Sequence, residues 1–385
     1  MTVRANWNYP TAIRFGAGRI AELADACKAS GMSAPLIVTD AFLGSLPMVG
    51  EALANLQAAG LKAAVFTDVR PNPTESNVVA GLKVLRDGGH DGVVAFGGGS
   101  PLDVGKVIAF MAGQKRPMWD FEDIGDWWTR ADPKGIAPIV AVPTTAGTGS
   151  EVGRAGVITQ EKTHTKKVIF HPAMMPKITI CDPVLTTGMP KAVTAGTGMD
   201  AFAHCLEAYC APGYHPLADG IAVEGMRLVK EFLPKAYADG QDVEARGHMM
   251  SAAAMGATAF QKGLGGMHAL AHPLGALCDT PHGMTNAVVM PYVLAFNKKA
   301  IKERIERLAA YMGLKPKFNV FLDHVLAMRE QLGVPHTLQD FGVDLSQVDT
   351  MAKMAPKDPT AGGNPVKITP SVARKLYQKA YDGTL

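Results

Sequence analysis

The sequence predicts two domains of different class: a parallel α/β domain over residues 1–185 and an all-α domain over residues 186–385. The chain has 385 residues, more than one hydrophobic core usually holds. In the first half, short β-branched runs alternate with amphipathic stretches. After about Pro183 the chain is instead rich in Ala, Met, Leu and His at helical spacing, and strand-like runs are scarce.

Four apolar runs of the first half are predicted to be buried strands, and two amphipathic stretches between them are predicted to be helices. The strands are 35–39, 63–68, 92–96 and 136–142, and the helices are 50–59 and 75–86. Continuous apolar strands separated by helices are typical of βαβ units. We therefore expect a mainly parallel, Rossmann-like sheet.

The second half reads as a series of helices. The predicted helices are 193–209, 217–236, 243–260, 267–276 and 300–310. Apolar residues at helical spacing and the lack of alternating runs favour a domain built from helices alone.

Charge and cysteine usage exclude several classes of protein. The formal net charge is only +3, from 38 basic and 35 acidic residues, which gives no case for a nucleic-acid or anionic-membrane partner. Residues 1–16 lack the apolar block of a signal peptide, and no apolar run is long enough to span a bilayer. Five cysteines without a C-x-x-C pair favour a reducing cytoplasm over a disulfide framework.

A glycine-rich turn follows the predicted strand at 92–96. The segment FGGGSP at 96–101 leads into a helix that carries Asp103 and Lys106. Glycines let the backbone approach a ligand, and free N–H groups at a helix start favour an anion, so this turn suits a pyrophosphate. The pattern is not G-x-G-x-x-G, and a tight strand-to-helix connection is the alternative interpretation.

A second loop, PTTAGTGSE at 143–151, follows the predicted strand at 136–142 and offers several hydroxyl groups and two glycines. Hydroxyls can bond phosphate or carboxamide groups, although a turn that caps a helix with Glu151 in its first turn is the alternative. Ligands of open α/β sheets bind at the carboxyl ends of strands, so the two loops together predict a nucleotide site.

Asp40 ends the predicted strand at 35–39. An acid at this place can accept hydrogen bonds from both ribose hydroxyls of NAD and repel the 2′-phosphate of NADP. A turn or helix-cap aspartate is the alternative.

A carboxylate and several histidines recur at helical spacing in the second half. Asp200 and His204 are related as i and i+4, and so are His268 and His272, whereas His282 lies at an expected loop or helix start. This donor set suits a divalent transition metal such as Fe²⁺ or Zn²⁺. A core histidine or a surface Asp–His pair is the alternative, but the flanking residues are apolar rather than charged.

Five segments together resemble the iron-dependent alcohol dehydrogenases, also called the group III family, along nearly the whole chain. They are GGGSP-x-D-x-x-K at 97–106, PTT-x-GTGSE at 143–151, G-x-D-A-x-x-H at 198–204, H-x-x-x-H-P-x-G-A at 268–276 and PHG-x-x-N at 281–286. The combination is specific, whereas no single segment is. The resemblance implies a dehydroquinate synthase-like architecture and reversible hydride transfer between NAD and a small primary alcohol or diol, or its aldehyde.

The resemblance also implies residue roles. The metal ligands would be Asp200, His204, His268 and His282, and His272 would lie near the nicotinamide and the alcohol. The cofactor-binding residues would be Asp40, Asn72, Gly98, Gly99, Ser100, Thr144, Thr145, Thr148 and Lys167. Fe²⁺ is the expected metal and Zn²⁺ the alternative, because the same ligands serve both. A homodimer is expected as the commonest symmetric assembly.

The mechanism expected for such a protein begins with a cation that favours the deprotonated alcohol. The proton would leave through water or a relay that includes His272, and hydride would pass to the nicotinamide. Three alternatives stay open: a glycerol dehydrogenase-like or dehydroquinate synthase-like member of the same superfamily, a helical metal-dependent phosphohydrolase, and a nucleotide-binding protein without catalysis. The sequence does not identify the alcohol.

Overall fold

The computed structural model describes residues 11–385. These residues form two compact units. The N-terminal unit comprises the described residues up to Thr145 and the segment Gly149–Thr187, and the C-terminal unit comprises Ala146–Thr148 and Gly188–Leu385. The chain therefore joins the C-terminal unit for three residues before it returns to complete the N-terminal unit. The predicted absence of a signal peptide concerns residues 1–16, and residues 1–10 lie outside the described part.

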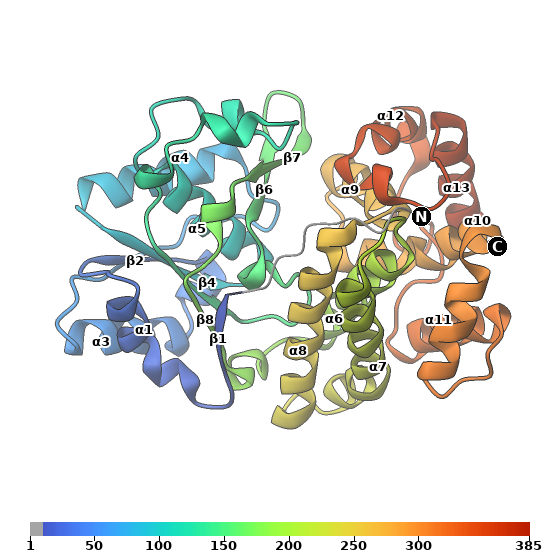
Figure 1. Cartoon of the computed structure of the whole chain (residues 1–385), viewed down its shortest axis with the longest axis horizontal. Coiled ribbons are helices and arrows are strands. Elements are labelled where there is room, and N and C mark those ends of the chain that lie inside the picture. The colour runs from blue at the N-terminus through green and yellow to red at the C-terminus, as the bar shows by residue number, and fades with distance from the viewer. Residues whose placement is uncertain (1–10) are drawn as a thin grey trace. The chain divides into compact units, whose positions relative to one another are not determined.

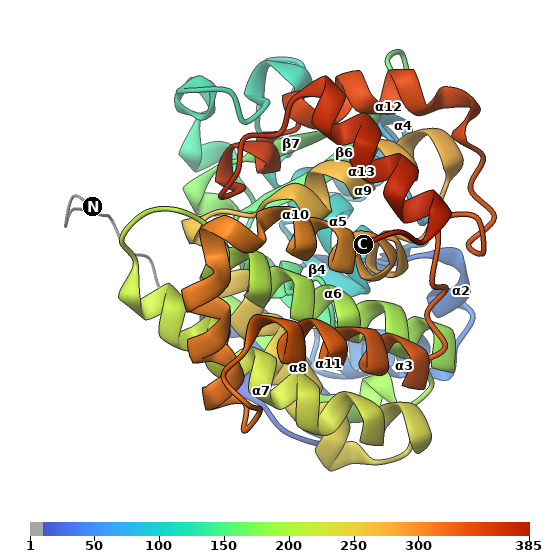
Figure 2. The same ribbon diagram turned by 90° about the vertical axis from the view of Figure 1, so that its right-hand side faces the viewer.

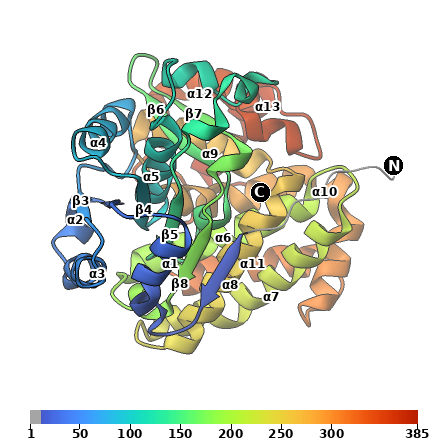
Figure 3. The same ribbon diagram turned by 60° about the vertical axis from the view of Figure 1, so that its left-hand side comes forward.

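Within the described residues, the N-terminal unit contains a six-stranded parallel sheet in the order β1-β8-β5-β4-β2-β3 (Figure 3). The strands are β1 Ala12–Phe15, β2 Pro35–Val38, β3 Ala64–Phe66, β4 Gly92–Gly97, β5 Ile139–Pro143 and β8 Ile178–Cys181. A separate antiparallel hairpin joins β6 Ala155–Gln160 to β7 Thr165–Phe170. Strand order reverses between β2 and β4, because β2 leads outward to β3 and β4 leads the other way to β5.

Both faces of this sheet are covered by helices, which explains why its strands are apolar without alternation. In β2, Leu36 and Val38 pack in one core cluster with α4 and α5, whereas Ile37 packs in another with α1 and α3. Figure 1 shows α4 and α5 on one side of β2 and α1 and α3 on the other. The helices are α1 Leu23–Ala29, α2 Ala41–Gly44, α3 Pro47–Ala58, α4 Glu75–Asp87 and α5 Gly99–Met111. The predicted parallel α/β fold is therefore confirmed for this unit.

Several details differ from the sequence-based expectation, since strands β1 and β8 and helices α1 and α2 were not predicted. The strand predicted at 136–142 begins only at Ile139, because Pro138 has no N–H to donate to the sheet. The β6–β7 hairpin was not predicted, because its strands are half-buried and rich in Lys and Thr, so they show neither a clean alternation nor an apolar run.

The described part of the C-terminal unit is helical. Its helices are α6 Lys191–Cys210, α7 Pro216–Ala238, α8 Val243–Ala259, α9 Gly266–Cys278, α10 His282–Tyr311, α11 Phe318–Gln331, α12 Val348–Met354 and α13 Pro370–Asp382. Helix α6 is buried along most of its length and packs against α7, α8 and α10 (Figure 2). The predicted all-α class is confirmed. The helix predicted at 300–310 is only the end of the long α10, and α11 to α13 were not predicted.

Among the described residues, every helix is too short or too polar to cross a membrane.

Candidate functional site

Helix α6 brings the first two predicted metal ligands together. Asp200 and His204 are one helical turn apart on a buried face, and the Asp200 Oδ1 atom lies 3.9 Å from the His204 Nε2 atom. The other positions at 198–205 are apolar or glycine and buried, so this polar pair lies in the core of the unit and not on its surface. Two of the four predicted donors therefore depend on one rigid element.

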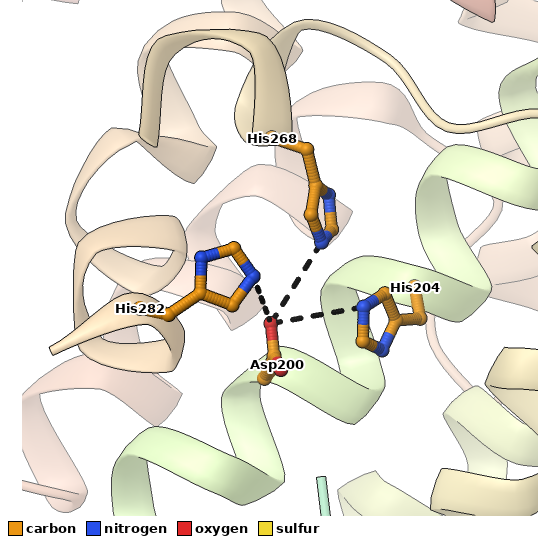
Figure 4. A group of neighbouring side chains, drawn as sticks. All are labelled: Asp200, His204, His268 and His282. Atoms are coloured by element: carbon orange, nitrogen blue, oxygen red, sulfur yellow. Dashed lines mark ion pairs between the residues drawn. The ribbon is translucent and has the colours of Figure 1, made fainter. Parts of the chain in front are cut away.

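Two further helices complete the group. His268 lies in the first turn of α9 and His282 is the first residue of α10, and their Nε2 atoms lie 3.9 Å and 3.7 Å from the Asp200 Oδ1 atom (Figure 4). One ligand atom from each of the four residues lies within 4.8 Å of the others. All three histidines turn Nε2 toward the carboxylate, so the side chains converge on one point.

This geometry fits a single transition-metal ion. Four ligands about 2.1 Å from a tetrahedral metal are about 3.4 Å apart. The histidines lie 3.7–3.9 Å from Asp200 Oδ1 and all four ligand atoms lie within 4.8 Å of one another, so binding a metal would draw the side chains closer together. The exposed fraction of the His282 side chain is 28%, against 3% for Asp200 and 2% for His268. The group is therefore open to ligands on the His282 side and closed on the others.

The hydrogen bonds behind two of the histidines select the tautomer that binds metals. The His204 Nδ1 atom is 3.3 Å from the Gly147 carbonyl oxygen, and the His268 Nδ1 atom is 2.6 Å from the Glu207 Oε2 atom. A proton on Nδ1 leaves the Nε2 lone pair available. Burial lowers the pKa of His204. Burial also opposes protonation of His268, but the hydrogen bond to Glu207 and the negative charges of Glu207, Asp200 and Asp358 together outweigh it and raise the pKa.

His272 lies beside this group. Its ring stacks on the His282 ring with the centroids 5.3 Å apart, and its Nδ1 atom is 2.7 Å from the Asp358 Oδ2 atom. Burial alone would raise the pKa of the Asp358 carboxyl, but His272 and the Thr360 N–H and O–H groups outweigh it and lower the pKa to about 2. The carboxylate can therefore hold the His272 ring in one orientation, with Nε2 directed away from it.

The helices that carry Asp200 and His282 are in backbone contact. A Cβ atom added to Gly283 would lie 2.3 Å from the Gly196 carbonyl oxygen and 3.0 Å from the Asp200 Cβ atom. Gly147 has a similar constraint, since its Cβ would lie 2.6 Å from the Thr197 Cβ atom. Glycine at these places lets the segments that carry the candidate ligands approach one another.

Sequence reasoning assigned no role to three residues that support the group. Glu207 and Asp358 bond His268 and His272, and the Asn286 Nδ2 atom donates to Asp200 Oδ1 at 2.8 Å. Asn286 belongs to the PHG-x-x-N segment, and Glu207 follows Asp200 at i+7 on the same helix face, so both carried a signal in the sequence. Asp358 had no such signal.

In the N-terminal unit, three of the predicted cofactor segments follow adjacent strands. Asp40 follows β2, the Gly97–Ser100 turn follows β4, and Thr144 and Thr145 are at the end of β5. Because β4 is hydrogen-bonded to both β2 and β5, and all three strands are parallel, these segments lie at the same edge of the sheet. The edge includes the point between β2 and β4 where the strand order reverses, which is where nucleotides bind in open α/β sheets.

The two loops contact each other closely. A Cβ atom on Gly98 would lie 3.2 Å from the Thr145 Cγ2 atom, and the Thr144 N–H donates to the Gly97 carbonyl oxygen at 2.9 Å. Helix α5 begins at Gly99 without a side-chain cap at Gly98. Its first N–H groups are therefore available for an anion.

Three predicted cofactor residues make structural hydrogen bonds or ion pairs. The Asp40 Oδ1 atom accepts from the Leu43 N–H at 2.8 Å and caps α2, and the Ser100 hydroxyl donates to the Pro71 carbonyl. The Lys167 Nζ atom is 2.7 Å from the Glu122 Oε2 atom. Lys167 lies on the β6–β7 hairpin, outside the six-stranded sheet. Asn72 lies in the turn before α4, and Thr148 belongs to the C-terminal unit.

The buried Lys106 and the half-buried Asp103, which follow the glycine turn, both contact the 143–151 loop. The Lys106 Nζ atom donates to the Ser150 and Ala155 carbonyls and lies 3.3 Å from Asp103 Oδ1, while the Ser150 hydroxyl also donates to Asp103. Burial raises the pKa of the nearby Glu151 to about 7. These contacts hold the Ser150 end of the 143–151 loop against α5, so Asp103 and Lys106 help to position the loop.

The chain matches two models of known families. "Iron-containing alcohol dehydrogenase" matches residues 10–183, and "Fe-containing alcohol dehydrogenase family, C-terminal" matches residues 194–381. The 4-hydroxybutyrate dehydrogenase of Cupriavidus necator is 39% identical over 97% of this chain and 98% of its own length. The 1,3-propanediol dehydrogenase of Citrobacter freundii is 37% identical over 95% and 96%. A crystal structure of a 1,3-propanediol oxidoreductase superposes with a TM-score of 0.92 at 36% identity, over 98% of this chain and 100% of that one.

Proposed function

The chain belongs to the iron-containing alcohol dehydrogenase family, and we propose on this basis that its C-terminal unit binds the metal and its N-terminal unit binds NAD. The family establishes the reaction class: the protein is an NAD- and iron-dependent oxidoreductase that transfers hydride between an alcohol and an aldehyde. The observation that carries the proposal is the convergence of one carboxylate and three Nε2 atoms from three helices.

In this proposal the four converging side chains are the metal ligands. Asp200 supplies the negative charge, and His204, His268 and His282 supply neutral imidazoles. A divalent cation held by these residues would supply Lewis-acid chemistry toward the alcohol or aldehyde oxygen. The partly exposed His282 marks the side from which an alcohol reaches the group.

The cofactor is proposed to bind at the carboxyl edge of the parallel sheet. The N–H groups of Gly99 and Ser100, together with the close backbone approach at Gly98, suit the pyrophosphate. Thr144 and Thr145 suit hydrogen bonds to the rest of the dinucleotide, and Asp40 suits the ribose hydroxyls. Asn72, Thr148 and Lys167 are the more peripheral members of the proposed set. NAD supplies the hydride acceptor, which the protein orients rather than activates.

His272 is proposed to move the alcohol proton. Its Nδ1 atom is held by Asp358, so Nε2 can accept a proton from the substrate hydroxyl, directly or through water. The stacking on His282 keeps the imidazole next to the ligand group. Asp358 orients the ring and stabilises its protonated form, without contact with the substrate.

We expect His272→Ala to lower kcat by roughly 10²–10⁴-fold, the usual contribution of a positioned general base. Metal content should stay at the wild-type level, because His272 is not one of the four converging ligands. The measurement is steady-state NADH formation alongside metal analysis of the same preparation. A variant that retains its metal and turns over near the wild-type rate would remove His272 from the mechanism.

For the substrate, we propose a short primary alcohol with a second oxygen function, such as a diol. The support is that similar proteins are named for 4-hydroxybutyrate, 1,3-propanediol and lactaldehyde, all small molecules with two oxygenated carbons. Simple monohydric alcohols are the second choice, since other relatives are named alcohol dehydrogenase 4 and methanol dehydrogenase.

The coenzyme preference is proposed to depend on the charge of Asp40. Asp40→Asn keeps an oxygen that can accept from the Leu43 N–H but removes the negative charge. We expect the ratio of kcat/KM for NADP to that for NAD to rise about tenfold, which corresponds to about 1.4 kcal/mol of relieved repulsion. Asp40→Ala, which loses the helix cap as well, is the matched control for stability. An unchanged ratio in Asp40→Asn would contradict the role of this charge.

The proposal as a whole is tested by metal removal. Protein purified without oxygen is stripped with a chelator, resupplied with Fe²⁺ or Zn²⁺, and assayed for NADH formation against 1,3-propanediol, 4-hydroxybutyrate and short monohydric alcohols. We expect turnover to return with Fe²⁺ and to depend on NAD. Phosphatase activity without NAD would instead favour a metal-dependent hydrolase, and NAD binding without metal binding would favour a protein that only binds nucleotide.

We further propose a homodimer in a reducing cytoplasm. All five cysteines lie within residues 11–385, and none is paired there in a disulfide. Light scattering of the purified protein tests the assembly, and a monomer at all concentrations would contradict it. Cell fractionation tests the compartment.

A further inference from the structure

One buried carboxylate connects the candidate metal group to the start of helix α9. Glu207 lies on α6 and its side chain is 3% exposed. Its Oε2 atom accepts from the Gly265 N–H at 3.0 Å and lies 2.6 Å from His268 Nδ1, and its Oε1 atom accepts from the Met267 N–H at 2.6 Å. Both carboxylate oxygens are therefore used, and all of these partners belong to the segment that presents His268.

These contacts replace an ordinary helix cap. The first N–H groups of a helix need partners, and no side chain of the preceding residue supplies them here. Glu207 binds two of these N–H groups, and Asn364 Oδ1 binds the third, from Gly266, at 3.0 Å. Cβ atoms on Gly265 and Gly266 would lie only 3.0 and 3.1 Å from these side-chain oxygens, so glycine permits the close approach.

The position of Glu207 on α6 explains why it reaches His268. Asp200, His204 and Glu207 occupy positions i, i+4 and i+7, so they lie along one face of the helix. The same helix thus carries two proposed ligands and the group that holds a third. A carboxylate behind a metal-binding histidine fixes the ring, keeps the proton on Nδ1 and makes Nε2 a better donor.

We propose that Glu207 is a positioning residue of the metal centre, which holds His268 for the cation and adds a negative charge behind it. This inference rests on the proposed metal site. Asp200 alone provides one negative charge for a divalent cation. Glu207 provides a second negative charge on the far side of the His268 ring, to which its carboxylate is hydrogen-bonded. Glu207 also fixes the backbone at the start of α9 through the Gly265 and Met267 N–H groups, and movement of this backbone would shift His268.

The test is the metal affinity of Glu207→Gln in the full-length chain. Glutamine keeps the size of the side chain but loses the charge and one acceptor oxygen. We expect the dissociation constant for Zn²⁺, measured by competition with a chromophoric chelator, to rise roughly 10–100-fold. The absorption spectrum of the Co²⁺-loaded variant should also change, because the field of the His268 ligand changes.

Asn364→Ser is the matched control, since Asn364 caps the same helix start but bonds none of the four ligands. It should lower the melting temperature and leave the Zn²⁺ affinity and Co²⁺ spectrum close to those of the wild type. If Glu207→Gln also lowers only the melting temperature, Glu207 is a helix cap and the inference is wrong. If the wild-type chain itself binds neither ion, the proposed metal site fails, which is a separate result.

Discussion

Replacing Asp200 with asparagine is expected to empty the metal centre and to lower alcohol oxidation by about three orders of magnitude. Asp200 Oδ1 is the atom that all three histidine Nε2 atoms face, at 3.7–3.9 Å. Asparagine preserves the shape but removes the only carboxylate among the four converging donors. Loss of several kcal/mol of charge stabilisation by a cation corresponds to a rate factor of about 10³.

The measurement is metal content by mass spectrometry together with kcat/KM for the best alcohol. Asp182→Asn is the matched control: Asp182 is an equally buried aspartate of the N-terminal unit, which accepts from the Ile20 and Val184 N–H groups at 3.0 Å. The control should retain its metal even if it is less stable. Wild-type metal content and turnover in Asp200→Asn would disprove the ligand role.

Gly283→Ala is expected to weaken both the fold and the metal centre. The added methyl group would lie 2.3 Å from the Gly196 carbonyl oxygen and 2.8 Å from its carbonyl carbon, which are backbone atoms that cannot rotate away. Helices α6 and α10 must therefore separate, and Asp200 moves away from His282. We expect a loss of about 1–3 kcal/mol in the free energy of unfolding, as for overpacked cores. The affinity for Zn²⁺ should fall at least about tenfold, because every 1.4 kcal/mol of lost ligand alignment corresponds to that factor.

Gly220→Ala is the control for this substitution. Gly220 is an exposed residue within α7 and has no neighbouring atom within 4 Å of an added Cβ. Alanine there should raise the free energy of unfolding by up to about 1 kcal/mol, because it is the better helix former. Urea denaturation of both variants, with and without Zn²⁺, separates the two effects. If Gly283→Ala is as stable as Gly220→Ala and binds Zn²⁺ as tightly as the wild type, the contact between α6 and α10 does not set the site.

Two pairs of the candidate site could be recognised in the sequence because their pattern is local, whereas the full set of four ligands came from the resemblance to the family. Asp200 and His204 are one helical turn apart among apolar neighbours, and so are His268 and His272. Burying two polar side chains is costly unless they bind a partner, so each pair indicates a site. The support behind these residues is not local. Glu207 bonds a histidine 61 residues away, and Asp358 bonds one 86 residues away. No spacing rule connects such partners, because tertiary packing alone brings them together.

The same distinction applies to the fold. Strands β2, β4 and β5 are buried on both faces and appear in the sequence as apolar runs, so their class and their order along the chain were predictable. The hairpin of β6 and β7 has mixed polarity, and its pairing is visible only in the structure. The sequence left a helix cap and a ribose contact as alternatives for Asp40. The structure shows the cap, which uses the Oδ1 atom, and the ribose contact stays a prediction.

The brief passage of the chain through the C-terminal unit at Ala146–Thr148 has a consequence for synthesis and folding. The Gly147 carbonyl leaves the ribosome 57 residues before His204, its hydrogen-bond partner. Domains generally fold as they emerge, with the N-terminal domain first. Residues 146–148 therefore make their contacts with the helical unit only after α6 has been synthesised, although the N-terminal unit on both sides of them in the sequence is made earlier. A fragment that begins at Gly188 would contain all four converging donors but not the carbonyl that holds His204. The helical unit is therefore incomplete without residues 146–148, which lie between two parts of the N-terminal unit in the sequence.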